Sequence, residues 1–343
     1  MSSTGRLEIE EVTRPVPGPG EALIRIEGCG ICGSDLHFYR ARSMRTGHTP
    51  GHEMAGVVAA TGADVSDLPD GTRVAVEPLR CCGECAPCRS GRDSQCRKLR
   101  LHGVHLPGGF AEYATVLARR LFPLPPQLSS AVAAMAEPAA VAVHGLRRGR
   151  LEKDQRVLVL GAGSVGLVCL IAARHLGASE VWVTARHPHQ AELARELGAA
   201  RVLSEADASI PALEQLSRQT ELGGFDLVVE TVGGEANTLT AASAALRPGG
   251  NISVLGLFTQ PPRIDALSLL LKEGNLCFSN CYHHPSKSEA DFHRAIEMLT
   301  TEADAFGRLS THQLPLAEIE RAFEIASEKR SGAIKVTVLP NGD

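Results

Sequence analysis

The sequence lacks the features that mark nucleic-acid-binding, disordered and fibrous chains. It carries 35 Lys and Arg against 39 Asp and Glu, so its formal net charge of -4 offers no basic surface to nucleic acid. Charged residues make up 22% and hydrophobic residues 43%, which is ordinary globular usage. There is no internal repeat and no low-complexity tract. At roughly 100–200 residues per domain, 343 residues predict two domains, each large enough to bury a core.

Signals for secretion and membrane insertion are also missing. The first residues, MSSTGRLEIEEV, contain no apolar core of a signal peptide. The longest apolar stretch, residues 157–173, is interrupted by three glycines and a serine, which favours a strand, a turn and a helix over a membrane span. We therefore expect a cytoplasmic protein with neither a membrane nor a nucleic-acid partner.

The pattern of expected elements changes once along the chain. The first 135 residues are typical of short strands separated by turns, with strands expected at residues 23–26, 57–60 and 72–76. From about residue 139, buried strands alternate with helices, which predicts a doubly wound parallel sheet. Its elements are expected at residues 157–160, 165–175, 181–184, 190–197, 227–230, 236–246 and 252–255. Helices at 289–300 and 317–327 and a strand at 334–339 are expected to close the chain.

Half of the ten cysteines fall in one short segment. The ligands expected from their spacing, two-residue gaps followed by a gap of seven residues, are Cys82, Cys85, Cys88 and Cys96. Four thiolates at this spacing suit a tetrahedral Zn²⁺ with every position filled, which holds a loop together and leaves no place for substrate. The two-residue gaps favour Cys82 over its neighbour Cys81. The alternative is a loop of unligated cysteines.

A glycine-rich turn follows the apolar run at residues 157–160. Gly161, Gly163 and Gly166 form a GxGxxG pattern between an expected strand and an expected helix, which is the context of a dinucleotide fingerprint. The glycines let the backbone approach a pyrophosphate held at the helix N-terminus. The alternative is a glycine-rich turn that binds no ligand.

The end of the next expected strand bears on the choice between NAD and NADP. An acidic residue there would bind the ribose 2′-hydroxyl, but this chain has Ala185 followed by Arg186. A guanidinium suits a 2′-phosphate, so we expect NADP(H) to be preferred over NAD(H), with His187 and His189 contributing to the same site. The alternative is that Arg186 is only a solvated loop residue.

A second group of residues has the composition of a catalytic zinc site. Cys32 lies in the run GICGSD, and His52 and Glu53 lie in the run GHE. A cysteine, a histidine and carboxylates with one open position are typical of a zinc ion that acts on a substrate.

With these motifs the sequence resembles the zinc-containing medium-chain dehydrogenases and reductases, on the branch of sorbitol, butanediol and threonine dehydrogenases. The run that begins at Gly51 and continues to Val65 matches the zinc signature of that family at every fixed position. The blocks GFAEY at 109–113, Glu137-Pro138 and GAIKV at 332–336 also match, and the likeness covers nearly the whole chain.

The resemblance implies a fold and a division into domains. Residues 1–138 would form a GroES-like β-rich catalytic domain with two zinc sites, and residues 139–280 a Rossmann dinucleotide-binding domain. Residues 281–343 would return to the catalytic domain. Relatives suggest a homodimer or a homotetramer.

The resemblance also implies roles for individual residues. Cys32 and His52 would ligate the catalytic zinc, and Glu53 and Glu137 would ligate it or hold its water. Ser34 would receive the hydroxyl proton and His37 would relay it, unless His37 is only a packed or surface residue. The cofactor would contact Gly161, Gly163, Ser164, Val165, Gly166, Ala185, Arg186, Thr231, Val232, Leu255 and Gly256. Lys335 matches a family lysine to which we give no role.

The expected reaction transfers a hydride between NADP(H) and a secondary alcohol, diol or polyol and its ketone. Ser279 stands where sorbitol dehydrogenases place an arginine, which argues against a sugar polyol. The loop that carries Arg40, Arg42, Arg45 and His48 raises the hypothesis of an anionic substrate. The alternatives are an NAD-dependent polyol or threonine-type dehydrogenase, a reductase without catalytic zinc, and a non-catalytic dinucleotide-binding protein.

Overall fold

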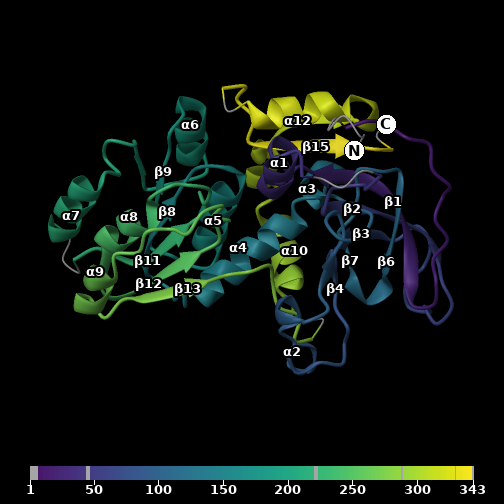
Figure 1. Ribbon diagram of the computed structural model, residues 1–343, viewed down its shortest axis with the longest axis horizontal. Helices are drawn as coiled ribbons and strands as arrows, with labels where there is room; N and C mark the ends of the chain where they lie inside the picture. Colours follow the sequence, from purple (N-terminus) through teal and green to yellow (C-terminus); the bar gives the residue numbers. More distant parts are fainter. Residues whose placement is uncertain (1–6, 44–46, 220–222, 287–288, 329, 342–343) are drawn as a thin grey trace. The chain divides into compact units, whose positions relative to one another are not determined.

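The computed structural model describes residues 7–43, 47–219, 223–286, 289–328 and 330–341. The chain divides into two compact units, one formed by Met1–Pro138 with Tyr282–Asp343 and the other by Ala139–Cys281. The chain therefore leaves the first unit once and returns to it once (Figure 1).

A seven-stranded sheet forms the frame of the first unit. Its strand order is β14-β15-β1-β2-β3-β7, and β6 pairs with β1 outside this path. The strands of this unit are β1 (Glu21–Gly30), β2 (Glu53–Thr61), β3 (Arg73–Val76), β4 (Leu79–Arg80), β5 (Arg100–Leu101), β6 (Tyr113–Leu117), β7 (Leu121–Pro123), β14 (Ser310–Pro315) and β15 (Lys335–Leu339). Its helices are α1 (Gly33–Arg40), α2 (Ala86–Arg89), η1 (Asp93–Gln95), η2 (Ala118–Arg120), α3 (Ser130–Ala133), α10 (Asp291–Thr301), α11 (Ala303–Leu309), η3 (Leu316–Glu318) and α12 (Ile319–Ser327). The helix α4 (Ala136–Arg148) begins in this unit and continues into the second.

The register of this sheet brings distant segments to one end of β1. Gly30, the last residue of β1, pairs with Glu53 at the start of β2 and with Thr337 in β15. A Cβ at position 30 would lie 2.0 Å from a Glu53 carboxylate oxygen, so only glycine lets that side chain pass. The end of β1, the start of β2 and the start of β15 therefore form the base of a common site.

The second unit contains a six-stranded sheet, all of whose described pairs are parallel. Its strand order is β10-β9-β8-β11-β12-β13, with helices against it. The strands are β8 (Arg156–Leu160), β9 (Glu180–Thr184), β10 (Arg201–Leu203), β11 (Phe225–Glu230), β12 (Leu246–Val254) and β13 (Asn275–Phe278). The helices are α5 (Ser164–His175), α6 (Pro188–Glu196), α7 (Ile210–Gln219), α8 (Thr238–Ala245) and α9 (Ala266–Leu271).

Continuous apolar runs form this sheet because both of its faces are covered. Every residue of β11 is buried, and Leu158, Val228 and Ile252 meet in one core cluster. The apolar stretch at residues 157–173 forms β8, a glycine turn and most of α5, as its interrupted pattern predicts. Within the described part of the chain, no helix combines the length and the apolar character that crossing a membrane requires.

Candidate functional site

The four cysteines of the zinc motif converge in the lobe around α2. The sulfur atoms of Cys82, Cys85, Cys88 and Cys96 all lie within 4.8 Å of one another. The Sγ–Sγ distances are 3.4 Å for Cys85–Cys88, 3.6 Å for Cys82–Cys96 and 3.9 Å for Cys82–Cys88. Tetrahedral zinc with Zn–S bonds of about 2.3 Å needs sulfurs roughly 3.8 Å apart, so the cluster fits the metal.

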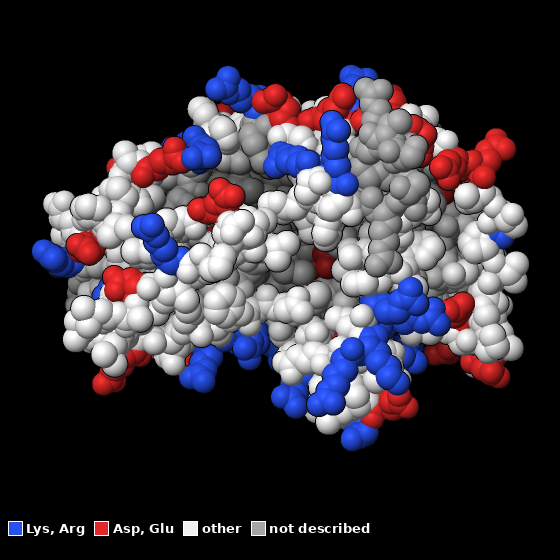
Figure 2. All heavy atoms as spheres, in the orientation of Figure 1, with Lys and Arg blue, Asp and Glu red and all other residues white. Residues whose placement is uncertain are grey.

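Backbone N–H groups donate hydrogen bonds to sulfur atoms of this cluster and so favour the thiolate form that binds a cation. Those of Glu84 and Cys85 lower the pKa of the Cys82 thiol to about 6. The N–H groups of Cys82 and Lys98 both point at the Cys96 sulfur, each at 3.4 Å. Figure 2 shows basic side chains gathered over this lobe. The exposed ones are Arg89, Arg92, Arg97, Lys98 and Arg100.

The fifth cysteine of the segment belongs to a different cluster. Cys81 is buried and lies 2.7 Å from a guanidinium nitrogen of Arg120. That guanidinium also pairs with Glu77 and Asp93, and the three charged side chains are all buried. Cys81 and Asp93 lie close enough to Cys88 to suggest an alternative metal site, but Arg120 already supplies the positive charge there. The structure thus places Cys82 with the zinc cysteines and leaves Cys81 with Arg120.

The residues expected at the catalytic zinc also come together. The ligand atoms of Cys32, His52 and Glu53 lie within 4.8 Å of one another, where the start of β2 meets the residues that follow β1. His52 and Glu53 are buried and Cys32 is partly exposed. A thiolate, an imidazole and a carboxylate form a donor set that suits zinc with a position left for substrate.

Two buried charges that the motif search did not assign hold these ligands in place. Asp35 accepts a hydrogen bond from the Cys32 N–H at 3.0 Å, and its other oxygen lies 3.6 Å from His52 Nδ1. Lys335 Nζ lies 2.8 and 2.7 Å from the two carboxylate oxygens of Glu53. Metal ligands are commonly oriented by such neighbours. Asp35 stands three residues after Cys32, which is the signal that sequence reasoning passed over.

Glu137, in the first turn of α4, borders this group without joining its closest cluster. Burial raises the pKa of the Glu137 carboxyl to about 7; the charge of Glu53 also raises it, while His52, Lys335 and the Tyr282 hydroxyl lower it. Tyr282 is fully buried, at the point where the chain re-enters the first unit. The pKa of the Glu137 carboxyl is thus raised mainly because the side chain is buried beside the candidate metal ligands.

The remaining residues expected near this site lie on or after α1. Ser34 and His37 occupy α1 and are both partly exposed. Arg40, the last residue of α1, donates a hydrogen bond to the Ser327 carbonyl at 2.9 Å. Arg42 is exposed, His48 is partly buried, and Arg45 lies outside the described residues.

The glycine-rich turn in the second unit has the geometry of a dinucleotide fingerprint. Gly161 has φ +103°, a conformation that favours glycine, and a Cβ at Gly166 would lie 1.9 Å from the Gly161 carbonyl oxygen. Gly163 is the N-cap of α5, with Ser164 and Val165 in the first turn. Because α5 runs for 12 residues, its free N–H groups and dipole favour an anion at this end.

The end of β9 carries the residues expected to distinguish NAD from NADP. Ala185 is buried and Arg186 is exposed. Arg186 Nε lies 2.6 Å from an oxygen of Glu205, which follows β10. The rings of His187 and His189 stack at 5.6 Å. Glu205 is therefore an acidic residue next to the position expected to distinguish NAD from NADP. The sequence around β9 does not reveal it, because it follows the neighbouring strand β10.

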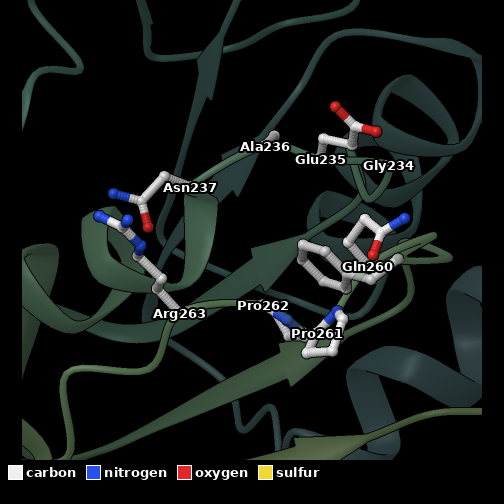
Figure 3. A pocket seen from close by; sticks show the side chains of 9 residues that line it. Gly234, Glu235, Ala236, Asn237, Gln260, Pro261, Pro262 and Arg263 are labelled. Atoms are coloured by element: carbon white, nitrogen blue, oxygen red, sulfur yellow. The ribbon is translucent and has the colours of Figure 1, made fainter.

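The last expected cofactor residues lie at the carboxyl ends of β11 and β12. Thr231 and Val232 follow β11, and Leu255 and Gly256 follow β12. The Thr231 hydroxyl donates to the Leu160 carbonyl at 2.8 Å, which ties this loop to the end of β8. Beside these loops the surface is hollowed by residues 234–237, 258 and 260–263, none of which is a cysteine or a histidine (Figure 3).

Known proteins that are similar to this chain are dehydrogenases. Residues 18–126 match the model of the alcohol dehydrogenase GroES-like domain, and residues 164–301 match that of the zinc-binding dehydrogenases. The chain is 32% identical to an L-threonine 3-dehydrogenase of Stenotrophomonas maltophilia, covering 95% of this chain and 94% of that protein. It is 31% identical to a sorbitol dehydrogenase of Bacillus subtilis, covering 99% and 96%.

Solved structures extend the likeness to the fold. A crystal structure from Sinorhizobium meliloti, described as a zinc-binding dehydrogenase bound to NADP, is 29% identical. It superposes with a TM-score of 0.86 and covers 99% of this chain and 97% of that one.

Proposed function

This chain belongs to the zinc-binding alcohol dehydrogenase family, an oxidoreductase family, and from that membership we propose that it interconverts a secondary alcohol, diol or polyol and its ketone with NADP(H). The observation that carries the proposal is the Cys32, His52 and Glu53 cluster, whose donor set suits an open zinc site. The reductase without catalytic zinc lacks support because these ligands are present and oriented.

Each residue of the cluster has its own task in this proposal. When bound, zinc supplies a Lewis acid that makes an alcohol hydroxyl more acidic, and NADP supplies the hydride acceptor. Cys32 and His52 hold the metal, and Asp35 orients both of them. Lys335 pairs with the buried Glu53 carboxylate and fixes its position. Glu137 ligates the metal or holds its water.

Proton movement is assigned to α1. In oxidation, the alcohol carbon loses a hydride and its hydroxyl loses a proton. Ser34 receives that proton and His37 relays it towards solvent, since an imidazole accepts and releases protons near neutral pH. Cys82, Cys85, Cys88 and Cys96 hold a second zinc that fixes the lobe around α2 and takes no part in the reaction.

The preference for NADP over NAD is supported by the end of β9. Ala185 leaves no carboxylate on that strand to repel a 2′-phosphate, and Arg186 supplies a guanidinium whose two terminal nitrogens remain for phosphate. Glu205 engages Arg186 through Nε and reduces its positive charge. The preference is therefore moderate rather than absolute, and a similar structure binds NADP.

We also propose that the chain assembles into a homodimer or homotetramer. The second unit exposes apolar side chains around α9, and β13 is the last strand of its sheet. The exposed ones are Ile264, Leu267, Leu270, Leu271 and Phe278. An apolar surface of this kind next to a sheet edge is typical of an interface between subunits. Light scattering of wild type and Leu270→Asp tests it: wild type is expected as an oligomer and the variant as a monomer, and a monomeric wild type contradicts the assembly.

A titration followed by a substrate panel tests the function. Zinc-loaded protein is titrated with NADPH and with NADH while the fluorescence of Trp182, the single tryptophan, is followed. NADPH is expected to bind more tightly. Neutral ketones, hydroxy ketones and keto acids are then offered with NADPH, and turnover is expected with neutral ketones. Binding of neither cofactor overturns the proposal, and tighter NADH binding overturns the NADP assignment alone.

A further inference from the structure

Glu230, the last residue of β11, is a buried acidic side chain with no part in the roles given above. It is 0% exposed. Its Oε1 accepts hydrogen bonds from the N–H groups of Val232 and Gly233, each at 2.9 Å, and from the Thr238 hydroxyl at 2.8 Å. A carboxylate oxygen is a strong acceptor, and all three donors converge on this one oxygen. The side chain therefore folds the loop that follows β11 back onto its own strand.

The main chain of the same residue holds the neighbouring turn. The Glu230 carbonyl accepts hydrogen bonds from the N–H groups of Leu255, at 2.8 Å, and Gly256, at 3.1 Å. Both residues follow β12, which pairs in parallel with β11. One residue thus binds the backbone of two loops at the carboxyl edge of the sheet, the edge at which open parallel sheets bind ligands.

The second carboxylate oxygen of Glu230 is directed at Gly256. Oε2 is buried and has no hydrogen-bond partner among the described residues. A Cβ at position 256 would lie 2.3 Å from it, so glycine is required there. A buried acceptor without a partner costs free energy, so such groups are rare in native proteins and call for an explanation.

We propose that Glu230 is a positioning residue for the nicotinamide half of the dinucleotide. The proposal rests on the proposed function and on the family resemblance, which implies that Thr231, Val232 and Leu255 lie beside that half. By binding the N–H groups of Val232 and Gly233 in one loop and of Leu255 and Gly256 in the other, Glu230 fixes both loops and leaves the exposed Val232 side chain to face the ligand. The adenosine half is assigned to the end of β9 and does not depend on Glu230.

Two ligands that differ by the nicotinamide half separate this role from a general loss of structure. Zinc-loaded wild type and Glu230→Ala are titrated by calorimetry with NADPH and with 2′,5′-ADP, which carries only the adenosine half. We expect NADPH to bind at least about tenfold more weakly to the variant, because charged hydrogen bonds that order the loop are lost. Binding of 2′,5′-ADP is expected to stay within about twofold. Glu230→Gln keeps an acceptor oxygen and is expected to restore most of the NADPH affinity.

Thr238 and Glu235 provide matched variants. Thr238→Val removes one donor to Glu230 and Thr238→Ser keeps it, so these variants test the proposal even if Glu230→Ala fails to fold. We expect weaker NADPH binding for the valine variant alone. Glu235→Gln makes an amide change at an exposed carboxylate of the same loop and is expected to bind both ligands as wild type does.

The outcomes distinguish a failure of the role of Glu230 from a failure of the proposed function. Unchanged NADPH binding in Glu230→Ala and Thr238→Val, or an equal loss of both ligands, overturns the role of Glu230 while leaving the dehydrogenase intact. Wild type that binds neither NADPH nor NADH overturns the proposed function and this inference with it.

Discussion

The ammonium group of Lys335 contacts both carboxylate oxygens of Glu53, at 2.8 and 2.7 Å, and both side chains are 1% exposed. The two residues are 282 positions apart in the chain. Burial lowers the pKa of Lys335, but the hydrogen bonds and charge of Glu53 together with the charges of Cys32 and Glu137 raise it above its ordinary value, so the lysine stays protonated. The pair joins the C-terminal strand to the candidate metal cluster.

Removal of one partner of this pair should destabilise the protein. Lys335→Met leaves the Glu53 carboxylate buried without a positive charge, which typically costs about 3–5 kcal/mol. The free energy of unfolding is measured by urea denaturation of metal-free protein. The double variant Lys335→Met/Glu53→Gln removes both charges of this pair and is expected to recover much of the loss. If Lys335→Met has the same free energy of unfolding as wild type, the ion pair does not stabilise the fold.

Arg120 should be required for the folded structure of the lobe around α2. Arg120→Met leaves two buried carboxylates, Glu77 and Asp93, without their shared cation, and we expect a loss of about 3–5 kcal/mol. Since Asp93 and Cys81 lie in the segment of the zinc cysteines, zinc should also be released to a chelator faster. Arg119→Met, at the neighbouring and more exposed position, is the control. Equal zinc release from the two variants contradicts this role.

His102 should make stability fall on mild acidification. Burial lowers the pKa of this imidazole below its ordinary value of 6.5, and its Nδ1 lies 2.9 Å from the Pro107 carbonyl. A base with a lowered folded pKa contributes stability that is present above about pH 6.5 and is lost as the pH falls through the folded value. His102→Asn should therefore lose less stability than wild type between pH 7.5 and 5, as measured by urea denaturation at each pH. If the free energy of unfolding falls equally with pH in wild type and His102→Asn, His102 is not the source of the pH dependence.

Glu205 should moderate the choice of cofactor. Glu205→Gln removes the carboxylate paired with Arg186, which frees positive charge for a 2′-phosphate. Exposed pairs contribute about 0.2–1 kcal/mol, so the ratio of NADPH to NADH affinity should rise by a factor between about 1.4 and 5. Fluorescence titration measures the ratio, and Glu192→Gln, at another exposed position of the same unit, should leave it unchanged. A fall in the ratio would mean that Glu205 helps to bind NADP.

Local patterns were enough to predict the parallel sheet of the second unit and the residues that meet in the two candidate metal clusters. The four cysteines lie in one short segment, and the turn from Gly161 to Gly166 lies directly between β8 and α5. Both motifs are therefore local in the sequence. Strands with continuous apolar runs, such as β8 and β11, were found near their observed bounds. The helix expected at 236–246 begins at Thr238 and ends at Ala245, because the loop bound by Glu230 occupies its first residues.

Relations across the sheet could not be predicted from one sequence. Short or polar elements such as β10, β13 and α9 carry too little periodicity to stand out. The partners of Glu53, Arg186 and Arg120 come from other strands or loops, and only the folded register brings them together. The sequence therefore indicated which candidate metal ligands come together but not Asp35, Glu205 and Glu230, which contact and position other residues.

Hydride transfer at the Cys32 cluster is the central claim, and isotope transfer tests it most directly. Zinc-loaded protein is incubated with a ketone from the panel and NADPH carrying deuterium at the reacting carbon, and the alcohol product is analysed by mass spectrometry. We predict deuterium on the carbinol carbon with wild type and with Cys277→Ser, a cysteine outside both zinc clusters, and at least a hundredfold less (about 3 kcal/mol or more of lost transition-state stabilisation) with Cys32→Ser. Equal deuterium transfer by wild type, Cys32→Ser and metal-free protein would contradict the account.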